Sequence, residues 1–302
     1  MTWPENAVTP RRRTVIAIPA SLVSDVPHLR ERTLKVGLVG RAAAIFRVDE
    51  VTIYYDMGAR DQIEDANFIR LILEYMETPQ YLRKGLFRLL PGLRYAGILP
   101  PLRTPHHPTS CRLNDLHVGE FREGRVLRLT RRGALVDVGV EKPILVGNLR
   151  RRGRVTVKLM ELGEKPTGIV VDRDLIPTYW GYRIEVSDLS LGSLMAERMK
   201  ESIVIATSRY GRLITDVETR IKEALRRYTS ATIIFGSPKE GLSEILRREG
   251  LRAKDVSHFV VNAIPFQGTK TVRTEEAIYA CLSIFNALYA RTNTLGPSIQ
   301  EP

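Results

Sequence analysis

Short apolar runs and amphipathic helical segments alternate over the N-terminal part of the chain. Residues 14–22 and 50–56 are predicted to be buried strands, and residues 30–48 between them are predicted to be a helix. A second helix is predicted over residues 65–79, which end at a proline. Strand, helix and strand form the crossover unit from which parallel sheets are built. We therefore expect an α/β domain.

The pattern changes between about Arg112 and Pro177. Short runs with alternating apolar residues are separated there by glycines: GRVLRL, GALVDVGV, RVTVKLM and GIVVDRD. Several short strands at this spacing predict a small antiparallel all-β barrel, and the OB-fold is a barrel of this kind that binds nucleic acids. The α/β pattern then returns. The barrel, residues 111–177, is expected to be inserted between the two halves of one α/β domain, residues 14–110 and 178–292.

Two glycine-containing loops in the C-terminal part follow predicted buried strands. They lie in ATIIFGSPKEGL (231–242) and in FVVNAIPFQGTKTVRTEEAIYACLSIF (259–285), and they contain Gly236, Gly241 and Gly268. In open α/β sheets, ligands bind at the carboxyl ends of strands. Glycine there can adopt a positive φ and lets a flat ligand approach the main chain. Any single glycine is more often an ordinary turn residue, so it is the pair of loops that favours a ligand site.

Two helices are predicted around these loops. Residues 215–228 follow a predicted strand, 202–211, and begin with Thr215 and Glu218 at the spacing of a capping box. The final helix begins after Thr274, a good N-cap residue, and acidic residues in its first turn suit the helix dipole.

Composition and charge indicate a polyanionic partner. The 302 residues carry 46 basic and 34 acidic side chains, a formal net charge of +12, with the excess concentrated in the middle of the chain. Nucleic acid is the partner that such a charge favours, although generic basicity is an alternative. Cys111 and Cys281 are the two cysteines; they form no metal-binding spacing and suit a reducing cytoplasm. No apolar run reaches the length of about 20 residues that crosses a bilayer, so we expect a soluble protein without membrane partners.

Clustered arginines on predicted turns of the barrel are candidates for RNA binding. Charge runs are usually solvated faces, but clustered arginine on a small barrel favours phosphate contact through counterion release. Aromatic residues are scarce in this segment, which favours contact with the RNA backbone over base stacking. The candidates are Arg131, Arg132, Arg150, Arg151, Arg152 and Arg154.

Several enzyme classes are disfavoured because their motifs are missing. The sequence contains no P-loop, no G-x-G-x-x-G and no G-x-S-x-G. His106 and His107 are adjacent and join no cluster of carboxylates or thiols, so no metal site is expected. These histidines either contact RNA or belong to a structural hinge at the entry to the barrel.

The chain resembles the archaeal and eukaryotic branch of the SPOUT superfamily of RNA methyltransferases. The resemblance rests on segments that span nearly the whole chain: VGLVGRAAAIFRVDEVTIYYD, LRYAGILPPLRTPHH, YWGYRIEV, IATSRYG, IIFGSPKEGL and VVNAIPFQGTKTVRTEEAI. It implies a SPOUT-type α/β domain with a C-terminal trefoil knot, interrupted by an inserted OB-like barrel. It also implies a homodimer, because such enzymes usually complete their active site across a two-fold interface.

The same resemblance implies a site for S-adenosylmethionine in the C-terminal loops. Ile264 and Val272 would provide the apolar walls of an adenine slot, although plain core packing is the alternative for each of them. The implied cofactor-binding residues are Thr207, Gly236, Ser237, Gly241, Asn262, Ile264, Gly268, Val272 and Thr274.

Arg41 resembles the arginine that opens a motif in ribose-methylating relatives and lies near the cofactor in the dimer. We nominate it as the catalytic or substrate-orienting residue, because a guanidinium can stabilise the acceptor anion; contact with phosphate or pairing with Asp49 or Glu50 is the alternative. Arg209 is a candidate RNA-binding residue. Arg209 and Arg273 are further candidates for contact with RNA phosphates or for catalysis. Glu275 is a candidate for anchoring the knot loop.

These observations predict an S-adenosylmethionine-dependent RNA methyltransferase that acts on a base. The candidate acceptor is the N3 atom of a uridine in ribosomal RNA. A non-catalytic RNA-binding ribosome assembly factor on the same scaffold is the alternative. Methylation of a protein side chain is a third possibility, which the basic barrel disfavours.

Overall fold

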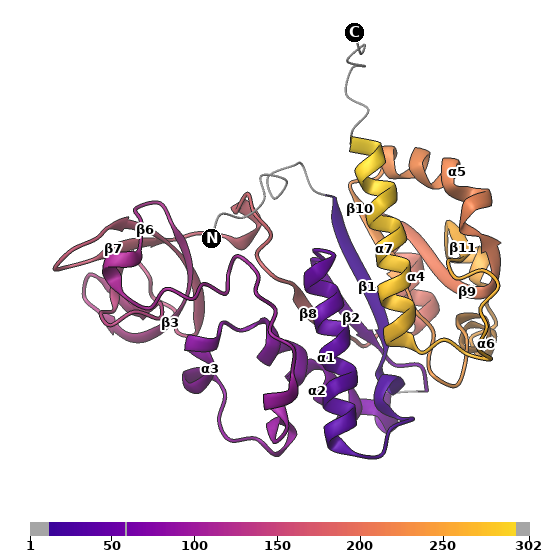
Figure 1. Cartoon of the computed structure of the whole chain (residues 1–302), viewed down its shortest axis with the longest axis horizontal. Helices are drawn as coiled ribbons and strands as arrows, with labels where there is room; N and C mark the ends of the chain where they lie inside the picture. Colours follow the sequence, from indigo (N-terminus) through magenta and orange to yellow (C-terminus); the bar gives the residue numbers. More distant parts are fainter. Residues whose placement is uncertain (1–11, 58, 294–302) are drawn as a thin grey trace, which may run out of the picture. The chain divides into compact units, whose positions relative to one another are not determined.

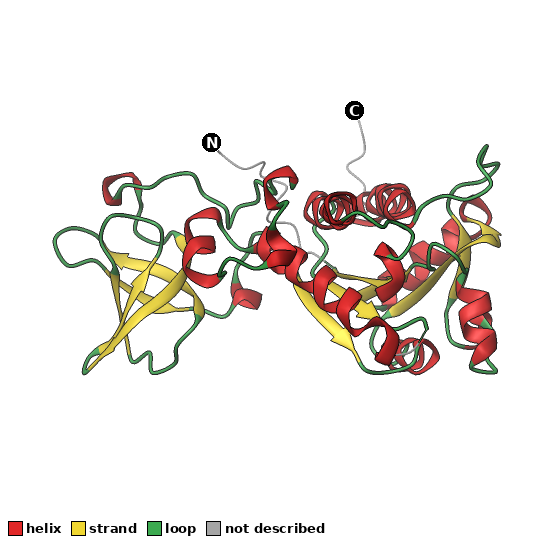
Figure 2. Cartoon of the chain, turned by 90° about the horizontal axis from the view of Figure 1, so that it is seen from below, coloured by secondary structure: helices red, strands yellow, loops and turns green. Residues whose placement is uncertain are grey.

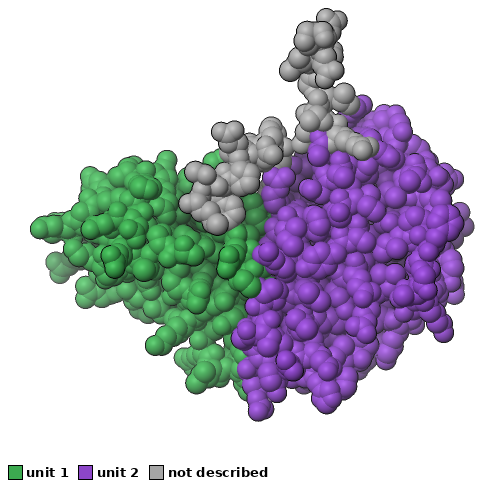
Figure 3. Space-filling view, in the orientation of Figure 1, with its two compact units in different colours: residues 1–10, 75–93, 101–181 green, residues 11–74, 94–100, 182–302 purple. Residues whose placement is uncertain are grey.

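The computed structural model describes residues 12–57 and 59–293, which form two compact units (Figure 3). The barrel unit consists of Tyr75–Leu93 and Pro101–Gly181. The sheet unit consists of the described parts of Arg11–Glu74, Arg94–Pro100 and Tyr182–Pro302. Each unit is described by itself below.

The sheet unit is built on a parallel sheet of six strands, labelled in Figure 1. Its order is β11-β9-β10-β1-β2-β8, and every pairing between neighbours is parallel. The carboxyl ends of all six strands therefore meet at one edge. The strands are β1 (Arg13–Pro19), β2 (Glu50–Tyr54), β8 (Arg183–Ser187), β9 (Ile203–Leu213), β10 (Ser230–Ile234) and β11 (Phe259–Asn262).

Helices cover both faces of this sheet. Figure 2 shows α1 and α7 side by side over one face, where they contact each other, and α5 also contacts α7. On the opposite face, α4 and α6 pack against side chains of β1, β2, β9 and β10 in one apolar cluster. Among the described residues, no helix is both long and apolar enough to cross a membrane. The helices are α1 (Leu29–Ile45), α2 (Ala59–Glu77), α4 (Leu191–Arg198), α5 (Ile214–Arg227), α6 (Leu242–Arg248) and α7 (Thr274–Asn293).

The strands β1 and β2 lie inside the sheet and are buried on both faces, which explains why they are recognisable in the sequence. Every residue from Thr14 to Pro19 in β1 is buried, as are all five residues of β2. Ala17 and Tyr54 belong to the cluster under α4 and α6, so Ile16 and Ile18 point to the other face, because successive side chains alternate along a strand. Strands covered on both faces have this continuous apolar pattern.

Three elements of the sheet unit escape the sequence pattern: β8, α4 and α6. In β8 only Ser187 is buried, and Arg183 and Glu185 are exposed, so the strand lacks an apolar run. The capping box expected at Thr215 is wrong. The helix begins at Ile214, its N-cap is Leu213 without a side-chain bond, and the Thr215 hydroxyl donates to Asp216 instead.

The barrel unit contains a closed barrel of five strands in the order β3-β4-β5-β7-β6. All pairings are antiparallel except that of β5 with β7, which is parallel and corrects the expectation of a purely antiparallel barrel. Its interior is an apolar cluster that includes Val136, Ile144 and Val157. The strands are β3 (Phe121–Thr130), β4 (Gly133–Asp137), β5 (Ile144–Gly147), β6 (Arg154–Glu161) and β7 (Thr167–Val170).

The barrel unit is wider than the segment 111–177 expected from the sequence. It includes the short helix α3 (Gln80–Leu86), which packs against β3. The Tyr81 hydroxyl donates to the Glu123 carbonyl at 2.8 Å, and the Arg125 guanidinium donates to the Gly85 carbonyl at 3.0 Å. These bonds attach residues that precede the barrel in the sequence to its surface.

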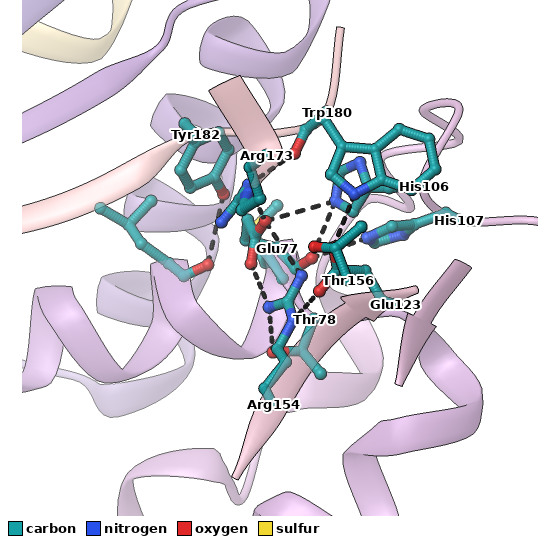
Figure 4. Close-up of polar contacts among 12 residues, drawn as sticks. Glu77, Thr78, His106, His107, Glu123, Arg154, Thr156, Arg173, Trp180 and Tyr182 are labelled. Atoms are coloured by element: carbon teal, nitrogen blue, oxygen red, sulfur yellow. Dashed lines mark hydrogen bonds and ion pairs between the residues drawn. The ribbon is translucent and has the colours of Figure 1, made fainter. Parts of the chain in front are cut away.

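A buried polar network stabilises this unit (Figure 4). Arg154 forms ion pairs with the carboxylates of Glu77 and Glu123, which are 3% and 1% exposed. Arg173 pairs with Glu77 at 2.8 Å, and the Trp180 indole N–H donates to Glu123 at 2.6 Å. The expectation that Arg154 lies on an exposed turn with its neighbours is therefore wrong. It is the first residue of β6, and its guanidinium is committed to two internal carboxylates.

His106 and His107 belong to the same network. The Nε2 atom of each lies 2.8 to 2.9 Å from the Glu77 carbonyl oxygen, which can only accept, so each ring donates from Nε2. The Nδ1 atom of His106 is buried without a hydrogen-bond partner. Burial lowers the pKa of His106 well below its usual value and lowers the pKa of His107 to about 4. Both rings are thus neutral parts of the interior, which favours the structural alternative over RNA contact.

We predict that acid destabilises the protein through His107. The unfolded chain binds a proton near pH 6.5 and the folded chain only near pH 4, so the free energy of unfolding falls as the pH falls through this window, by about 3 kcal/mol at most. The measurement is urea unfolding followed by tryptophan fluorescence between about pH 7 and about pH 4.5. His107→Gln should show a shallower pH dependence, whereas His117→Gln, at an exposed position, should match the wild type. Equal slopes in all three proteins would contradict the assignment.

Candidate functional site

A cavity of about 300 Å³ lies in the sheet unit where β9, β10 and β11 approach their carboxyl ends. Three segments surround it: Thr207–Tyr210 within β9, the loop that follows β10, and the loop between β11 and α7. The position is the one that parallel sheets offer to ligands, because strand ends expose main-chain groups there while the sheet holds the loops in place.

Eight of the nine predicted cofactor-binding residues line this cavity, and Gly268 does not. Gly268 is exposed in the loop between β11 and α7. The eight lining residues are Thr207, Gly236, Ser237, Gly241, Asn262, Ile264, Val272 and Thr274.

The loop after β10 is closed by its own polar groups. The Ser237 amide donates to the Glu240 carbonyl at 2.9 Å, and the Glu240 amide donates to the Ser237 hydroxyl at 3.0 Å. A Cβ at Gly236 would lie 3.1 to 3.2 Å from main-chain atoms of the same loop. Close packing therefore favours glycine at position 236. Gly236, Gly241 and Gly268 do not use the positive φ that glycine allows.

The loop between β11 and α7 is anchored at both ends. The Asn262 side-chain amide donates to the Arg209 carbonyl, and its oxygen accepts from the Ile264 amide, both at 3.0 Å. The Thr274 hydroxyl donates to the Gly236 carbonyl at 3.1 Å, which joins the start of α7 to the loop after β10. Thr274 is thus not the N-cap expected from the sequence; the Arg273 amide instead donates to the Glu276 carboxylate.

A buried ion pair holds the first turn of α7 against α1. The Lys35 ammonium lies 2.7 Å from the Asp25 carboxylate and 3.6 Å from that of Glu275. Lys35 and Glu275 are each 5% exposed. This geometry agrees with the anchoring role considered for Glu275 in the sequence.

Glycine and aromatic residues that sequence reasoning missed also shape the site. Gly211 lets β9 and β11 approach closely, because a Cβ there would lie 2.6 to 2.8 Å from main-chain atoms of Val260 and Val261. Phe235 and Cys281 line the cavity and are almost fully buried. Burial raises the pKa of the Cys281 thiol to about 12, so this cysteine is not an activated nucleophile. The segment IATSRYG carries no signal that would distinguish Gly211 from a turn glycine.

Arg41 does not line the cavity within one chain. It lies on α1, opposite Tyr279 on α7. Burial raises the pKa of Tyr279, and the positive charge of Arg41 offsets part of this increase. Three exposed apolar residues, Leu34, Leu38 and Ile45, lie on the same helix at spacings of three and four from one another or from Arg41. These four residues share one face of α1.

The barrel arginines gather on two adjacent turns. Arg131 and Arg132 are exposed between β3 and β4, and residues 150–152 are exposed between β5 and β6. The Arg150 guanidinium donates to the carbonyls of Thr130 and Arg131 at 2.8 and 3.0 Å, which joins the two turns. Arg209 lies in the sheet unit on the cavity wall instead, where it donates to the Lys270 carbonyl at 2.8 Å.

Residues 13–285 match a family described as "Putative RNA methyltransferase". The chain belongs to this family. Among its relatives, the 28S rRNA (uridine-N(3))-methyltransferases of Mus musculus and Homo sapiens are 32% and 30% identical to it, over 89% of this chain and 74% and 76% of theirs. An uncharacterized protein of Haloarcula marismortui is 32% identical over 89% of this chain and 97% of its own.

The expected enzyme class is thereby confirmed: the chain is an RNA methyltransferase. Such an enzyme needs a pocket for a methyl donor and a surface for a polyanion. The cavity and the arginine turns are the candidates for these two roles. Among the described residues, no group of three or more histidine, cysteine or carboxylate side chains could hold a metal ion.

We predict that Gly211→Ala disrupts the cavity. The added methyl group would collide with the main chain of β11, which cannot rotate away, so we expect a loss of about 1–3 kcal/mol in the free energy of unfolding. Gly147→Ala is the matched control, because a Cβ at this strand residue meets nothing within 4 Å. Urea unfolding measures both variants, and a Gly211→Ala protein as stable as Gly147→Ala would contradict the close approach of β9 and β11.

Proposed function

We propose that the protein is an S-adenosylmethionine-dependent methyltransferase that modifies N3 of a uridine in ribosomal RNA. The observation that carries the proposal is the cavity at the ends of β9, β10 and β11, which collects eight residues nominated for the cofactor. The names of the relatives support the substrate, since two of them are 28S rRNA (uridine-N(3))-methyltransferases.

The residues around the cavity fit S-adenosylmethionine in size and chemistry. A volume of about 300 Å³ is at the lower end of the range for small-molecule pockets. Ile264 and Val272 provide apolar walls for a flat base, and Glu240 and Glu244 provide carboxylates beside the loop after β10. Ser237, Asn262 and Thr274 keep the loops in shape by bonding to main-chain groups. The ligand is then recognised by the loop main chain and the apolar walls.

Methyl transfer to uridine is an in-line displacement. N3 would release its proton to solvent, and the N3 electron pair would then form a bond to the methyl carbon as the carbon–sulfur bond of the donor breaks. S-adenosylmethionine supplies the activated methyl group. The protein aligns the acceptor, excludes water and stabilises the anion that N3 becomes, a role for which Arg41 is the candidate.

The barrel unit is proposed as an OB-like module that holds the RNA backbone. Its five strands and closed order suit this fold, and Arg131, Arg132 and residues 150–152 present cations on two joined turns. These residues contact phosphates and release counterions, so they contribute affinity for RNA without reading its sequence.

We further propose that the chain has the SPOUT fold with a trefoil knot in its C-terminal part. The support is the path of the last segments: β11 returns to the far side of β9, and α7 then begins against the loop after β10 through Thr274 and Gly236. Threading of this kind is rare in proteins.

A homodimer would bring Arg41 to the methyl donor. Arg41 lies outside the cavity of its own chain but on a face of α1 with exposed Leu34, Leu38 and Ile45. An exposed apolar stripe on a helix favours an interface, and a two-fold interface over α1 and α7 would bring the guanidinium towards the partner's cavity.

A non-catalytic assembly factor is the competing function. It would bind RNA but not the cofactor, whereas the intact loops around the cavity favour cofactor binding.

We predict that S-adenosylmethionine and its demethylated product bind the wild type in calorimetry and that the wild type transfers labelled methyl to ribosomal RNA. Arg41→Ala should keep the affinity for the cofactor and lose about 100-fold in turnover, the typical effect of removing a group that stabilises an anion. Arg30→Ala, at an exposed position of the same helix, is the control. Undetectable binding at millimolar ligand would favour the assembly factor, and full activity of Arg41→Ala would remove only that residue's role.

We predict that Leu34→Glu converts the dimer to a monomer, because a carboxylate buried in an apolar interface loses its hydration without a partner. Sedimentation velocity measures the change. Leu175→Glu, on the barrel unit and 76% exposed, should leave the oligomeric state unchanged. A monomeric wild type would overturn the proposed interface.

A further inference from the structure

Only two aromatic side chains of the described residues are exposed, Tyr210 at 81% and Phe266 at 96%. Both lie beside the cavity: Tyr210 lines it, and Phe266 is next to Gln267, which also lines it. The other phenylalanine, tyrosine and tryptophan side chains of the described residues are buried or half-buried. The two exposed rings of the described residues therefore lie at one place, beside the candidate cofactor cavity.

Tyr210 is held in place by its neighbour. The Arg209 guanidinium carbon lies 4.7 Å from the centre of the Tyr210 ring, a cation–π contact. The same guanidinium donates to the Lys270 carbonyl, and the Arg209 carbonyl accepts from Asn262. The ring is thus oriented before any ligand arrives, with a cation stacked on it.

Phe266 is held in a conformation that bulky residues rarely adopt. Its φ is 54°, in the left-handed region, while its side chain remains in solvent. Such strain persists only where the surrounding loop imposes it and is concentrated at functional sites. The Lys270 carbonyl that accepts from Arg209 belongs to the same loop, so Phe266 and Tyr210 lie on two segments that are hydrogen-bonded together.

The surroundings of the two rings suit a nucleobase better than a protein surface. The residues that follow Phe266, from Gln267 to Thr271, are polar or glycine, so the loop beyond the ring is polar. The adjacent cavity is lined by three basic and two acidic side chains, a small excess of positive charge that favours a polyanion. The barrel unit has no exposed aromatic ring among its described residues, which favours the sheet unit for base stacking. Unpaired bases stack on aromatic rings of proteins whatever their sequence.

We propose that Tyr210 and Phe266 form a stacking platform for unpaired nucleobases of the RNA substrate at the rim of the cavity. The inference rests on the proposed function for the identity of the substrate. It assigns base contact to the sheet unit and leaves backbone contact to the barrel.

The direct test is Phe266→Trp titrated with a single-stranded oligouridylate of about ten nucleotides, a length within the usual site size. Stacking should quench the new indole emission, after subtraction of the wild-type signal. Tyr210→Ala and Phe266→Ala should each weaken binding about 5- to 100-fold, the effect of losing one stacked base. The variants Tyr210→Phe and Phe266→Tyr keep an aromatic ring and should therefore bind the oligouridylate as the wild type does. Thr269→Ala, in the same loop as Phe266, should also bind as the wild type does.

Salt dependence separates stacking from charge. The alanine variants should keep the slope of affinity against salt concentration, because a ring releases no counterions, whereas Arg151→Ala should reduce it. Binding of Tyr210→Ala and Phe266→Ala within twofold of the wild type, or no quenching of the indole, would overturn the platform. The platform would also be overturned if the variant with both alanine substitutions became monomeric and kept its affinity for RNA. The two rings would then contact a second copy of the chain. Quenching by RNA without any methyl transfer would overturn the proposed enzymatic function and leave the platform standing.

Discussion

The cavity depends on the parallel pairing of β9 with both β10 and β11. Because both neighbours run in the same direction as β9, Thr207, Gly236 and Ile264 meet at one edge of the sheet although they are far apart in the sequence. Gly211 permits the second pairing, because a Cβ at this position would collide with the main chain of β11. The β9–β11 pairing supports the start of the loop that carries Ile264, Phe266 and Val272, and the bond from Thr274 to the Gly236 carbonyl supports its end.

The polar residues around the cavity mainly hold its shape. The hydroxyls of Thr207, Ser237 and Thr274 and the amide of Asn262 all bond to main-chain groups of the surrounding segments. A loop fixed in this way loses little conformational freedom when a ligand binds, which improves affinity without any added contact. These three hydroxyls and the amide therefore position the main chain around the cavity.

The sequence reveals the elements whose apolar pattern is continuous and conceals those fixed by distant partners. The strands β1 and β2 and the long helices α1 and α7 are predictable because burial dictates their composition. The role of Arg154 is not, since its partners Glu77 and Glu123 lie 77 and 31 residues away, and an arginine beside three others suggests a solvated turn. Local patterning likewise suggests side-chain caps at Thr215 and Thr274, yet both hydroxyls donate elsewhere. The pair of glycine-containing loops indicates a ligand site by itself, but the individual side chains of the cavity could be nominated only through resemblance to a family.

In the proposed function, charge and aromatic exposure give one chain two physical ways of binding RNA. The arginines on the barrel turns attract any phosphate chain, and their contribution weakens as salt rises. The rings at the cavity rim contribute an interaction that salt barely screens and that requires a base to be free of its helix. Uridine N3 is engaged in pairing within a duplex, so methylation there also requires an unpaired base. Rings that favour single strands thus select the same state of the RNA that the chemistry needs.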